Sequence, residues 1–348
     1  MIDTPPIVFM HMMKTGGLTM VNILGEAFGP DHTFKLGNTR GDTVTYLDEL
    51  ESAAKDPAMR VFIGHFGWGV QHLFNRPVQF ATILRHPVDR VLSLIRYLGL
   101  PANDTGFLSE ALSALPEARD GMVRRLNGLT QADFSAGDTR DIDWRDMSRT
   151  DISIPLSDRH LDTAIQALDG FSVIGLQEKF PETLLLFRDR LDTPPLFNIT
   201  RPFLNNSENP LGRNNADPAI VALIEENNRL DLELYHRCRK EFDRTIGELE
   251  RRCPVEMSVQ RLLNNGLARR GVQVLDEDEA FATIQEMING LLRTDRLKEA
   301  ACLLCFLLSK PLDRETAEPC LILLRKIGSR DEIQREESSF TSRYGNLP

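Results

Sequence analysis

The chain has 348 residues, of which 41% are hydrophobic and 26% are charged, a composition that excludes a mostly disordered chain. Its net charge is −10, but the first hundred residues are neutral, with nine basic and nine acidic side chains. Because unspecific binding to nucleic acids or anionic membranes relies on a broad basic surface, neither partner is expected. An anionic ligand must instead be held in a local pocket.

The sequence indicates a cytoplasmic protein without a membrane span. Its longest apolar stretch lies around Leu303 to Leu308 and falls far short of the roughly 20 residues that cross a bilayer. No basic segment leading into an apolar core stands at its start, so no secretory signal is expected. The five cysteines all lie at or beyond Cys238 and form no disulfide framework. Cys302 and Cys305 are expected in a helical core, and no metal site is predicted.

Short apolar runs alternate with helical patterns over the first 250 residues. Runs of buried-strand length occupy residues 7–10, 61–65, 80–85 and 171–175. Helical patterns occupy residues 18–28, 87–98, 181–191 and 218–249. This alternation favours an α/β fold, a three-layer P-loop-like domain with a central parallel sheet. In such sheets ligands bind at the carboxyl ends of the strands.

From residue 251 onward the pattern is helical only. Helices are expected at 255–270, 277–294, 297–308 and 314–327. We therefore predict two domains, an α/β domain over 1–250 and a C-terminal all-α appendage over 251–348. The helix pairs of the appendage resemble tetratricopeptide-type hairpins, although no repeat of fixed period is present. A helical cap on the α/β domain is the alternative.

A glycine-containing loop joins the first expected strand to the first expected helix. It consists of Lys14, Thr15, Gly16, Gly17, Leu18 and Thr19. Backbone N–H groups and the dipole at a helix N-terminus bind anions, so this loop predicts a phosphate site. It is not a Walker A loop, because its lysine precedes the glycines, and this disfavours a kinase or GTPase. The alternative is a glycine turn with a surface lysine.

A second anion site is expected where the third strand passes into its helix. Arg85 ends that strand, and Ser93 lies eight residues later on the polar face of the helix. That face carries Asp89, Arg90, Ser93, Arg96 and Tyr97. A guanidinium and a hydroxyl provide charged and neutral donors, so Arg85 and Ser93 together predict binding of a second phosphate. Two such sites imply a ligand with two separated phosphates, and a surface stripe without a ligand is the alternative.

Both segments resemble motifs of the sulfotransferases related to the heparan sulfate 2-O and 6-O enzymes. Residues 11–20 resemble the HxPKTGGTS loop of that family, and residues 82–97 resemble its TxLRDPVxRxxSxxxY segment. Matches in the second segment are Arg85, Pro87, Arg90, Ser93 and Tyr97. Weaker similarity occurs at Val173 to Leu176, Glu178, Phe180, Asn228, Asp231, Leu234 and Tyr235. The resemblance spans about residues 5–247 and does not cover the C-terminal helices.

This resemblance implies 3′-phosphoadenosine-5′-phosphosulfate (PAPS) as the cofactor. The loop from Lys14 to Thr19 would bind its 5′-phosphosulfate, and Arg85 with Ser93 would bind its 3′-phosphate. Leu18 stands where the family usually has a threonine, and Met13 replaces its usual proline. The transfer requires no metal.

His65 is the expected general base. It lies in the segment 64–69, Gly-His-Phe-Gly-Trp-Gly, which follows the second strand and resembles a histidine-containing segment of the same family. An imidazole titrates near neutral pH and accepts the proton of an attacking hydroxyl. Lys14 is expected to contact the leaving phosphate, and Phe66 and Trp68 are candidate surfaces for the acceptor. A histidine that makes only structural hydrogen bonds is the alternative.

The predicted function is sulfuryl transfer from PAPS to an acceptor hydroxyl, and the resemblance alone implies a carbohydrate acceptor. Two alternatives stay open. A kinase would need a magnesium-binding carboxylate at a strand end, whereas the strand ends here carry His11, His65 and Arg85. A catalytically inactive nucleotide-binding or scaffold protein would use the helical appendage to bind a partner, and Leu18 supports this alternative.

Overall fold

The computed structural model describes residues 4–35, 43–101, 103–127, 155–191, 193, 212–268, 277–308 and 312–345. Within them the chain forms two compact units, the first ending at Ile246 and the second beginning at Gly247. The division lies inside helix α10 (Arg229–Arg252). Each unit has a buried apolar core of its own.

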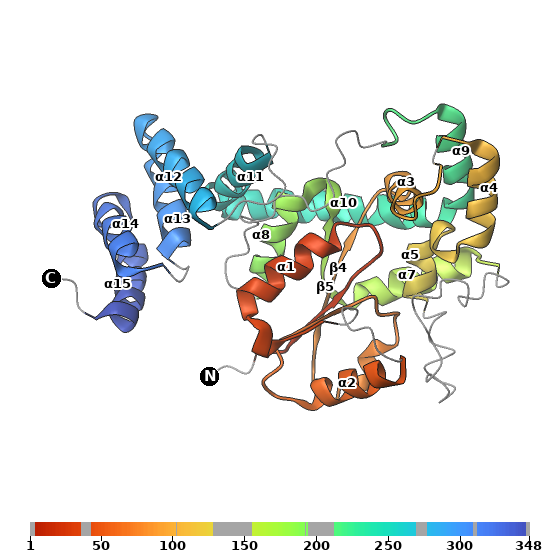
Figure 1. Cartoon of the computed structure of the whole chain (residues 1–348), viewed down its shortest axis with the longest axis horizontal. Helices are drawn as coiled ribbons and strands as arrows, with labels where there is room; N and C mark the ends of the chain where they lie inside the picture. Colours follow the sequence, from red (N-terminus) through yellow and green to blue (C-terminus); the bar gives the residue numbers. More distant parts are fainter. Residues whose placement is uncertain are drawn as a thin grey trace. The chain divides into compact units, whose positions relative to one another are not determined.

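A five-stranded parallel sheet with strand order β2-β3-β1-β4-β5 forms the centre of the first unit. Strands β4 and β5 of this sheet are labelled in Figure 1. The strands are β1 (Ile7–Met10), β2 (Thr33–Lys35), β3 (Val61–Gly64), β4 (Gln79–Leu84) and β5 (Phe171–Leu176). Every residue of β1 and β3 is buried, as expected for a parallel sheet that is covered on both faces. The predicted α/β fold with a central parallel sheet is confirmed. The pattern does not predict β2, because this edge strand is short and partly exposed.

Helices connect the strands and pack on the sheet. In the first unit they are α1 (Gly17–Phe28), α2 (Thr43–Lys55), α3 (Pro87–Tyr97), α4 (Thr105–Ala114), α5 (Gly121–Leu126), α7 (Asp158–Asp169), α8 (Phe180–Leu191), α9 (Pro218–Asn227) and the first part of α10. Helix α1 packs against β2 and β3, and α7 and α8 pack against β5. Apolar side chains of α3, including Val88, Val91 and Ile95, form a buried core with α4 and α9.

The helix predicted over 218–249 is two helices in the structure, and this corrects the expectation. Asn228 separates α9 from α10. Its buried side chain donates hydrogen bonds to the carbonyls of Ala118 and Ile224, at 2.8 and 3.0 Å. Because asparagine bonds readily to nearby backbone groups, it favours helix ends over helix interiors.

The strand order creates a change of direction between β1 and β4. β1 leads through α1 to β2 on one side of the sheet, whereas the chain continues from β4 through α3 to β5 on the other. Met10 at the end of β1 pairs with Gly64 and Thr82 of the two neighbouring strands. Open α/β sheets bind ligands outside the carboxyl ends of strands at such a change of direction. A ligand site is therefore expected at the loops after β1, β3 and β4.

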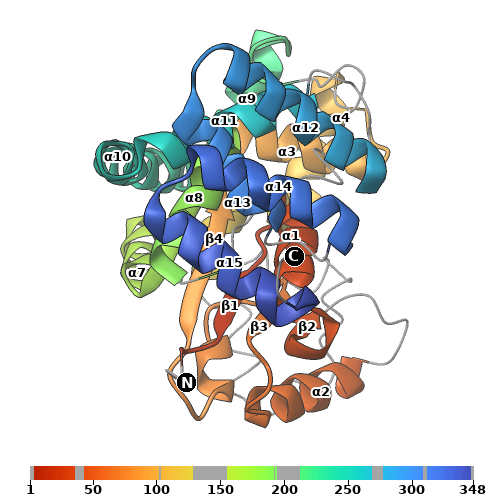
Figure 2. The ribbon, with the colours of Figure 1, turned by 90° about the vertical axis from the view of Figure 1, so that its left-hand side faces the viewer.

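The second unit consists of helices. They are α11 (Pro254–Ala268), α12 (Glu277–Arg293), α13 (Leu297–Leu308), α14 (Arg314–Ile327) and α15 (Arg330–Tyr344). Helix α13 packs against α11, α12, α14 and α15, and Figure 2 shows α13 among the helices of this unit. Leu303, Leu304 and Leu307 of α13 lie in the core of the unit. The sequence pattern does not predict α15, because few of its side chains are apolar and the buried Phe340 has polar neighbours in sequence.

Cys302 and Cys305 are half-buried on α13 and contact this core, so the expected helical environment is confirmed for both. Cys320 of α14 is buried in the same core. Among the helices that the structure describes, none combines the length and the apolar character needed to cross a membrane.

Candidate functional site

The loop between β1 and α1 contains two residues with left-handed backbone, Lys14 (φ 64°) and Gly16 (φ 81°). Thr15 between them is buried, and its hydroxyl donates to the Met12 carbonyl at 2.9 Å. Helix α1 then begins with no side-chain cap and no acidic residue in its first turn. An uncapped helix N-terminus favours an anion through its N–H groups and its dipole. Leu18 is the second residue of α1, and its side chain lies outside the described part of the chain.

The start of α1 packs directly on His11. This histidine follows β1, and its backbone N–H donates to the Gly64 carbonyl at 2.8 Å. A side chain at Gly17 would overlap the His11 imidazole, so glycine is required there. The two glycines of the loop thus have separate roles. Gly16 permits the left-handed turn, and Gly17 leaves room for His11.

Arg85 joins the two segments that are predicted to bind anions. It follows β4, and its Nη1 donates to the Lys14 carbonyl at 3.1 Å. Burial lowers the pKa of the guanidinium, while the carboxylates of Asp89 and Glu178 act in the opposite direction. The side chain stays charged, because arginine keeps its proton in proteins. A cation therefore lies next to the loop that contains Lys14.

Lys14 extends toward α3. Its Nζ lies 4.1 Å from the centre of the Tyr97 ring, a cation–π contact with a side chain that is 69% exposed. Burial lowers the pKa of Lys14, and the charges of Arg85 and Arg96 lower it further. Three basic side chains thus lie close together in a protein with a net charge of −10. An anion is the ligand that relieves their mutual repulsion.

Ser93 lies on the same face of α3 as Arg96 and Tyr97, because residues three and four positions apart share a helix face. It is half-buried. Because Lys14 contacts Tyr97, this face of α3 lies toward the loop between β1 and α1. Ser93 is therefore one helical turn away from the residue that Lys14 contacts.

Arg90 differs from the expectation of a polar surface stripe on α3. Only 1% of this residue is exposed, and its guanidinium lies 3.2 Å from the Asp231 carboxylate and 3.9 Å from that of Glu117. Asp89 is likewise paired, with Arg213 at 2.8 Å. The structure corrects the prediction, because Arg90 belongs to a buried ion-pair network and is not available to a ligand.

His65 follows β3, next to His11. Its Nδ1 is 2.8 Å from the His11 carbonyl, and the two imidazole rings are stacked with their centres 4.2 Å apart. A carbonyl only accepts, so the proton lies on Nδ1 and Nε2 is the proton acceptor of the ring. Burial and the charge of Arg125 lower the pKa of His65 to about 4, against the opposing effects of the His11 carbonyl and Glu117. The imidazole is therefore neutral at pH 7.

Two other histidines lie near the strand ends. Burial lowers the pKa of His11 well below its usual value, and His65, Arg125 and Lys14 act in the same direction. His86 is buried beside Tyr235, with ring centres 5.3 Å apart, and burial lowers its pKa to about 4. His86 is thus a packing residue at the start of α3, whereas His11 and His65 face each other.

Phe66 and Trp68 are not surfaces for an acceptor, which corrects the expectation. Phe66 is 3% exposed. Trp68 stacks on Phe171 and contacts Phe80 edge-on, with ring centres 5.4 and 5.2 Å apart. These two phenylalanines lie at the amino ends of β5 and β4, on the side away from Arg85. Apolar packing is thus the role of both side chains.

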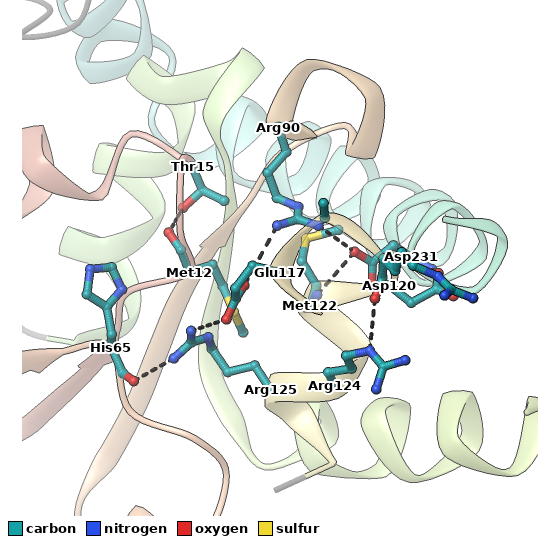
Figure 3. A network of polar contacts seen from close by, with 12 residues as sticks. Met12, Thr15, His65, Arg90, Glu117, Asp120, Met122, Arg124, Arg125 and Asp231 are labelled. Atoms are coloured by element: carbon teal, nitrogen blue, oxygen red, sulfur yellow. Dashed lines mark hydrogen bonds and ion pairs between the residues drawn. The ribbon is translucent and has the colours of Figure 1, made fainter. Parts of the chain in front are cut away.

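Two residues near His65 are not predicted from the sequence. Arg125 contacts the His65 segment, and Glu117 contacts Arg125. Arg125 of α5 donates to the His65 carbonyl at 2.5 Å and forms an ion pair with Glu117 (Figure 3). Neither residue belongs to a motif, and nothing in their sequence surroundings marks them. The weak similarity at Asp231 is the one signal that leads toward them, because Asp231 pairs with Arg90 and Arg90 contacts Glu117.

Among the described residues, no group of three or more His, Cys, Asp or Glu side chains is placed to hold a metal ion. No family model matches the chain, and no curated protein matches it. Function is therefore inferred from the fold and from the geometry of the site.

Proposed function

We propose that this protein is a PAPS-dependent sulfotransferase, which moves a sulfuryl group to an acceptor hydroxyl. The hydrogen bond from Arg85 to the Lys14 carbonyl is the observation that carries the proposal. It joins the uncapped start of α1 to a second cationic segment at the same edge of the sheet. This arrangement supports binding of a ligand with two separated phosphates, and His65 lies next to it.

The donor groups at this edge fit PAPS. The start of α1 with Lys14, Thr15, Gly16, Gly17, Leu18 and Thr19 would hold the 5′-phosphosulfate. Arg85 and Ser93 would hold the 3′-phosphate, and Arg96 adds a third cation beside Lys14 and Arg85. When bound, PAPS supplies a sulfuryl group attached to a phosphate that leaves readily.

His65 accepts the proton of the acceptor hydroxyl at Nε2, while the hydrogen bond at Nδ1 holds the ring in the required tautomer. Lys14 would supply positive charge to the leaving phosphate of a bound cofactor. Arg85 and Ser93 would hold the other end of that cofactor and so restrict its position relative to His65. Like phosphoryl transfer, the reaction depends mainly on positioning and charge stabilisation.

The acceptor is proposed to be a carbohydrate hydroxyl, on the sequence resemblance alone. The site geometry disfavours the kinase alternative. Glu178 is a carboxylate close after β5, but its Oε1 accepts the His86 backbone N–H at 2.7 Å and is thus engaged in holding the start of α3. The residues directly after β1, β3 and β4 are two histidines and an arginine, which are not magnesium ligands of the usual type.

Calorimetry with 3′-phosphoadenosine-5′-phosphate (PAP), compared with ATP and magnesium, tests the proposal. We expect PAP to bind and ATP with magnesium to bind much more weakly. The reverse order would favour a kinase. Binding of PAP without turnover of PAPS against a panel of carbohydrate acceptors would favour the inactive scaffold protein, and absence of PAP binding would refute the proposed site.

A substitution at Arg85 tests which phosphate it binds. Arg85→Ala is expected to weaken PAP binding by about 1.5 to 3 kcal/mol, roughly ten- to hundredfold, through loss of a charged hydrogen bond. Binding of adenosine-5′-phosphosulfate, which lacks the 3′-phosphate, should change much less. Arg60→Ala is the matched control, because Arg60 directly precedes β3 at the opposite edge of the sheet. Equal losses for both ligands would contradict the assignment.

A further inference from the structure

We infer that Arg125 is a positioning residue for His65, with its guanidinium holding the His65 backbone carbonyl. The inference rests on the proposed function, in which His65 is the base. It concerns a residue outside both anion-binding segments. Arg125 itself lies on α5, 60 residues after His65 in the sequence.

Arg125 holds the segment after β3 at three points. Its Nη1 donates to the carbonyls of His65 and Phe66, at 2.5 and 3.5 Å. Its own backbone carbonyl accepts the N–H of Trp68 at 3.0 Å. Arg125 thus holds the backbone of the segment that carries His65. The His65 ring itself is held by its hydrogen bond to the His11 carbonyl.

Arg125 is in turn held by a buried network (Figure 3). Glu117 pairs with Arg125 through one carboxylate oxygen and lies 3.9 Å from Arg90 through the other. Arg90 pairs with Asp231, which is fully buried in α10. Nη1 donates to the His65 carbonyl and Nη2 donates to Glu117, and these two bonds restrict the orientation of the planar Arg125 guanidinium.

Asp231 also fixes the helix that carries Arg125. Its carboxylate accepts the backbone N–H groups of Met122 and Val123 at the start of α5, at 3.1 and 2.8 Å. The Asp231 backbone N–H donates to the Asp120 side chain at 2.9 Å. Helix α5 has only six residues and would be marginal alone, so these bonds to α10 define its position.

The charges around His65 come from three elements. Arg125 of α5 disfavours a proton on the ring, whereas Glu117 before α5 favours one. The stacked His11 after β1 presents a neutral ring and its carbonyl, and Lys14 faces His11. Among the described residues, Arg125 is thus the cation whose charge lowers the pKa of His65. Removing its charge should allow the ring to bind a proton at higher pH.

Titration of the His65 imidazole by NMR tests this role without cofactor. The His65 signal is assigned by its loss in His65→Gln, and the protein is titrated between pH 3.5 and 8. In wild type we expect a midpoint near 4 with the proton on Nδ1. In Arg125→Gln we expect the midpoint to rise by about one pH unit or more, toward the usual 6.5 of histidine. Arg125→Lys keeps a cation and should stay close to wild type.

Arg124→Gln is the matched control. Arg124 is the preceding residue on the same helix, and its Nε donates to the Arg119 carbonyl at 3.0 Å. Its loss should not move the His65 midpoint. An unchanged midpoint in Arg125→Gln, or an equal shift in Arg124→Gln, would overturn the inference.

Turnover separates positioning from binding. Arg125→Lys should bind PAP as wild type does but turn over more slowly, because one ammonium does not reproduce the contacts to two carbonyls. Wild-type turnover in a folded Arg125→Lys would overturn the inference even if Arg125→Gln does not fold. A shifted NMR midpoint in a protein that fails to bind PAP would instead refute the proposed function and keep the role of Arg125.

Discussion

His65 and Lys14 lie at the ends of neighbouring strands, but their surroundings assign them to different steps. The His65 ring donates to the His11 carbonyl, the His65 carbonyl accepts from the Arg125 guanidinium, and the ring is neutral at pH 7. Lys14 lies beside Arg85 and Arg96 and remains able to contact an anion. In the proposed reaction, the first residue acts only on the acceptor and the second acts on the cofactor.

His65→Ala is expected to bind PAP with near wild-type affinity and to lose turnover by about 10²- to 10⁴-fold, the usual effect of losing a general base. Lys14→Ala should lose both affinity and turnover, because its charge contacts the phosphate before and during transfer. Calorimetry with PAP and a PAPS turnover assay measure the two effects. Normal turnover in His65→Ala would move the base elsewhere, with His11 the nearest candidate.

The pH dependence of the reaction should reflect the lowered pKa of His65. Only the neutral imidazole accepts a proton, so the rate rises with pH through the ionisation of this group. With a pKa of about 4, kcat/KM for PAPS should rise near pH 4 and be flat between pH 6 and 8. The rise of kcat with pH should occur at higher pH than the rise of kcat/KM, because an anion bound nearby favours the protonated His65 ring. A rise of kcat/KM centred near pH 6.5 would contradict the environment described for His65.

At the scale of single elements, the start of α1 shows how a local requirement overrides helix propensity. Alanine is favoured over glycine inside helices by about 1 kcal/mol. Gly17 is nevertheless required, because His11 occupies the space of a side chain at this position. The packing of α1 on the His11 ring therefore depends on one missing methyl group.

Gly17→Ala is expected to lower the free energy of unfolding by about 1 to 3 kcal/mol, as overpacking in a filled site does. Gly247→Ala is the control, since Gly247 lies inside α10 with open space around its Cβ position. This control should be stabilised by about 0.5 to 1 kcal/mol. Urea denaturation of both variants measures the difference. A stabilised Gly17→Ala would mean that the His11 ring moves aside without cost.

The elements that sequence predicts best are those with a strong and local pattern. Strands β1, β3, β4 and β5 are mostly apolar runs, and α3 begins at a proline, so each is found at nearly its observed bounds. The break at Asn228 depends on a hydrogen bond to Ala118, which lies 110 residues earlier, and no local pattern reports it. Strand β2 and helix α15 are not predicted for a different reason. Each buries little of its own surface, so its sequence lacks a continuous apolar pattern.

At the scale of the whole molecule, some residues of the proposed site can be predicted from local sequence motifs, whereas others are brought to it only by the fold. Lys14, Arg85 and Ser93 lie in motifs next to strand ends, and the topology brings their segments together. Arg125 and Glu117 lie in a stretch without a motif, and only the fold of α5 against α10 brings them to His65. The side chains that are proposed to bind a ligand are thus easier to predict than the side chains that hold His65 in place.

The two units also make a prediction about stability, because each has its own core. Leu304 is 1% exposed in the core of the second unit, and Leu92 is fully buried in that of the first. Replacing either by alanine should cost about 2 to 5 kcal/mol in the unit that contains it. Both tryptophans, Trp68 and Trp144, lie in the first 250 residues, so tryptophan fluorescence reports on that part of the chain.

Leu304→Ala is therefore expected to shift part of the circular dichroism transition to lower urea, while the fluorescence transition and the affinity for PAP stay unchanged. Leu92→Ala should shift the fluorescence transition, because it opens a cavity beside the helix that follows Arg85. A single transition that moves equally in both probes and in both variants would show that the units unfold together. In that case a change in the helical unit would also lower the stability of the unit that carries the proposed PAP site, and a partner that binds those helices would stabilise both units.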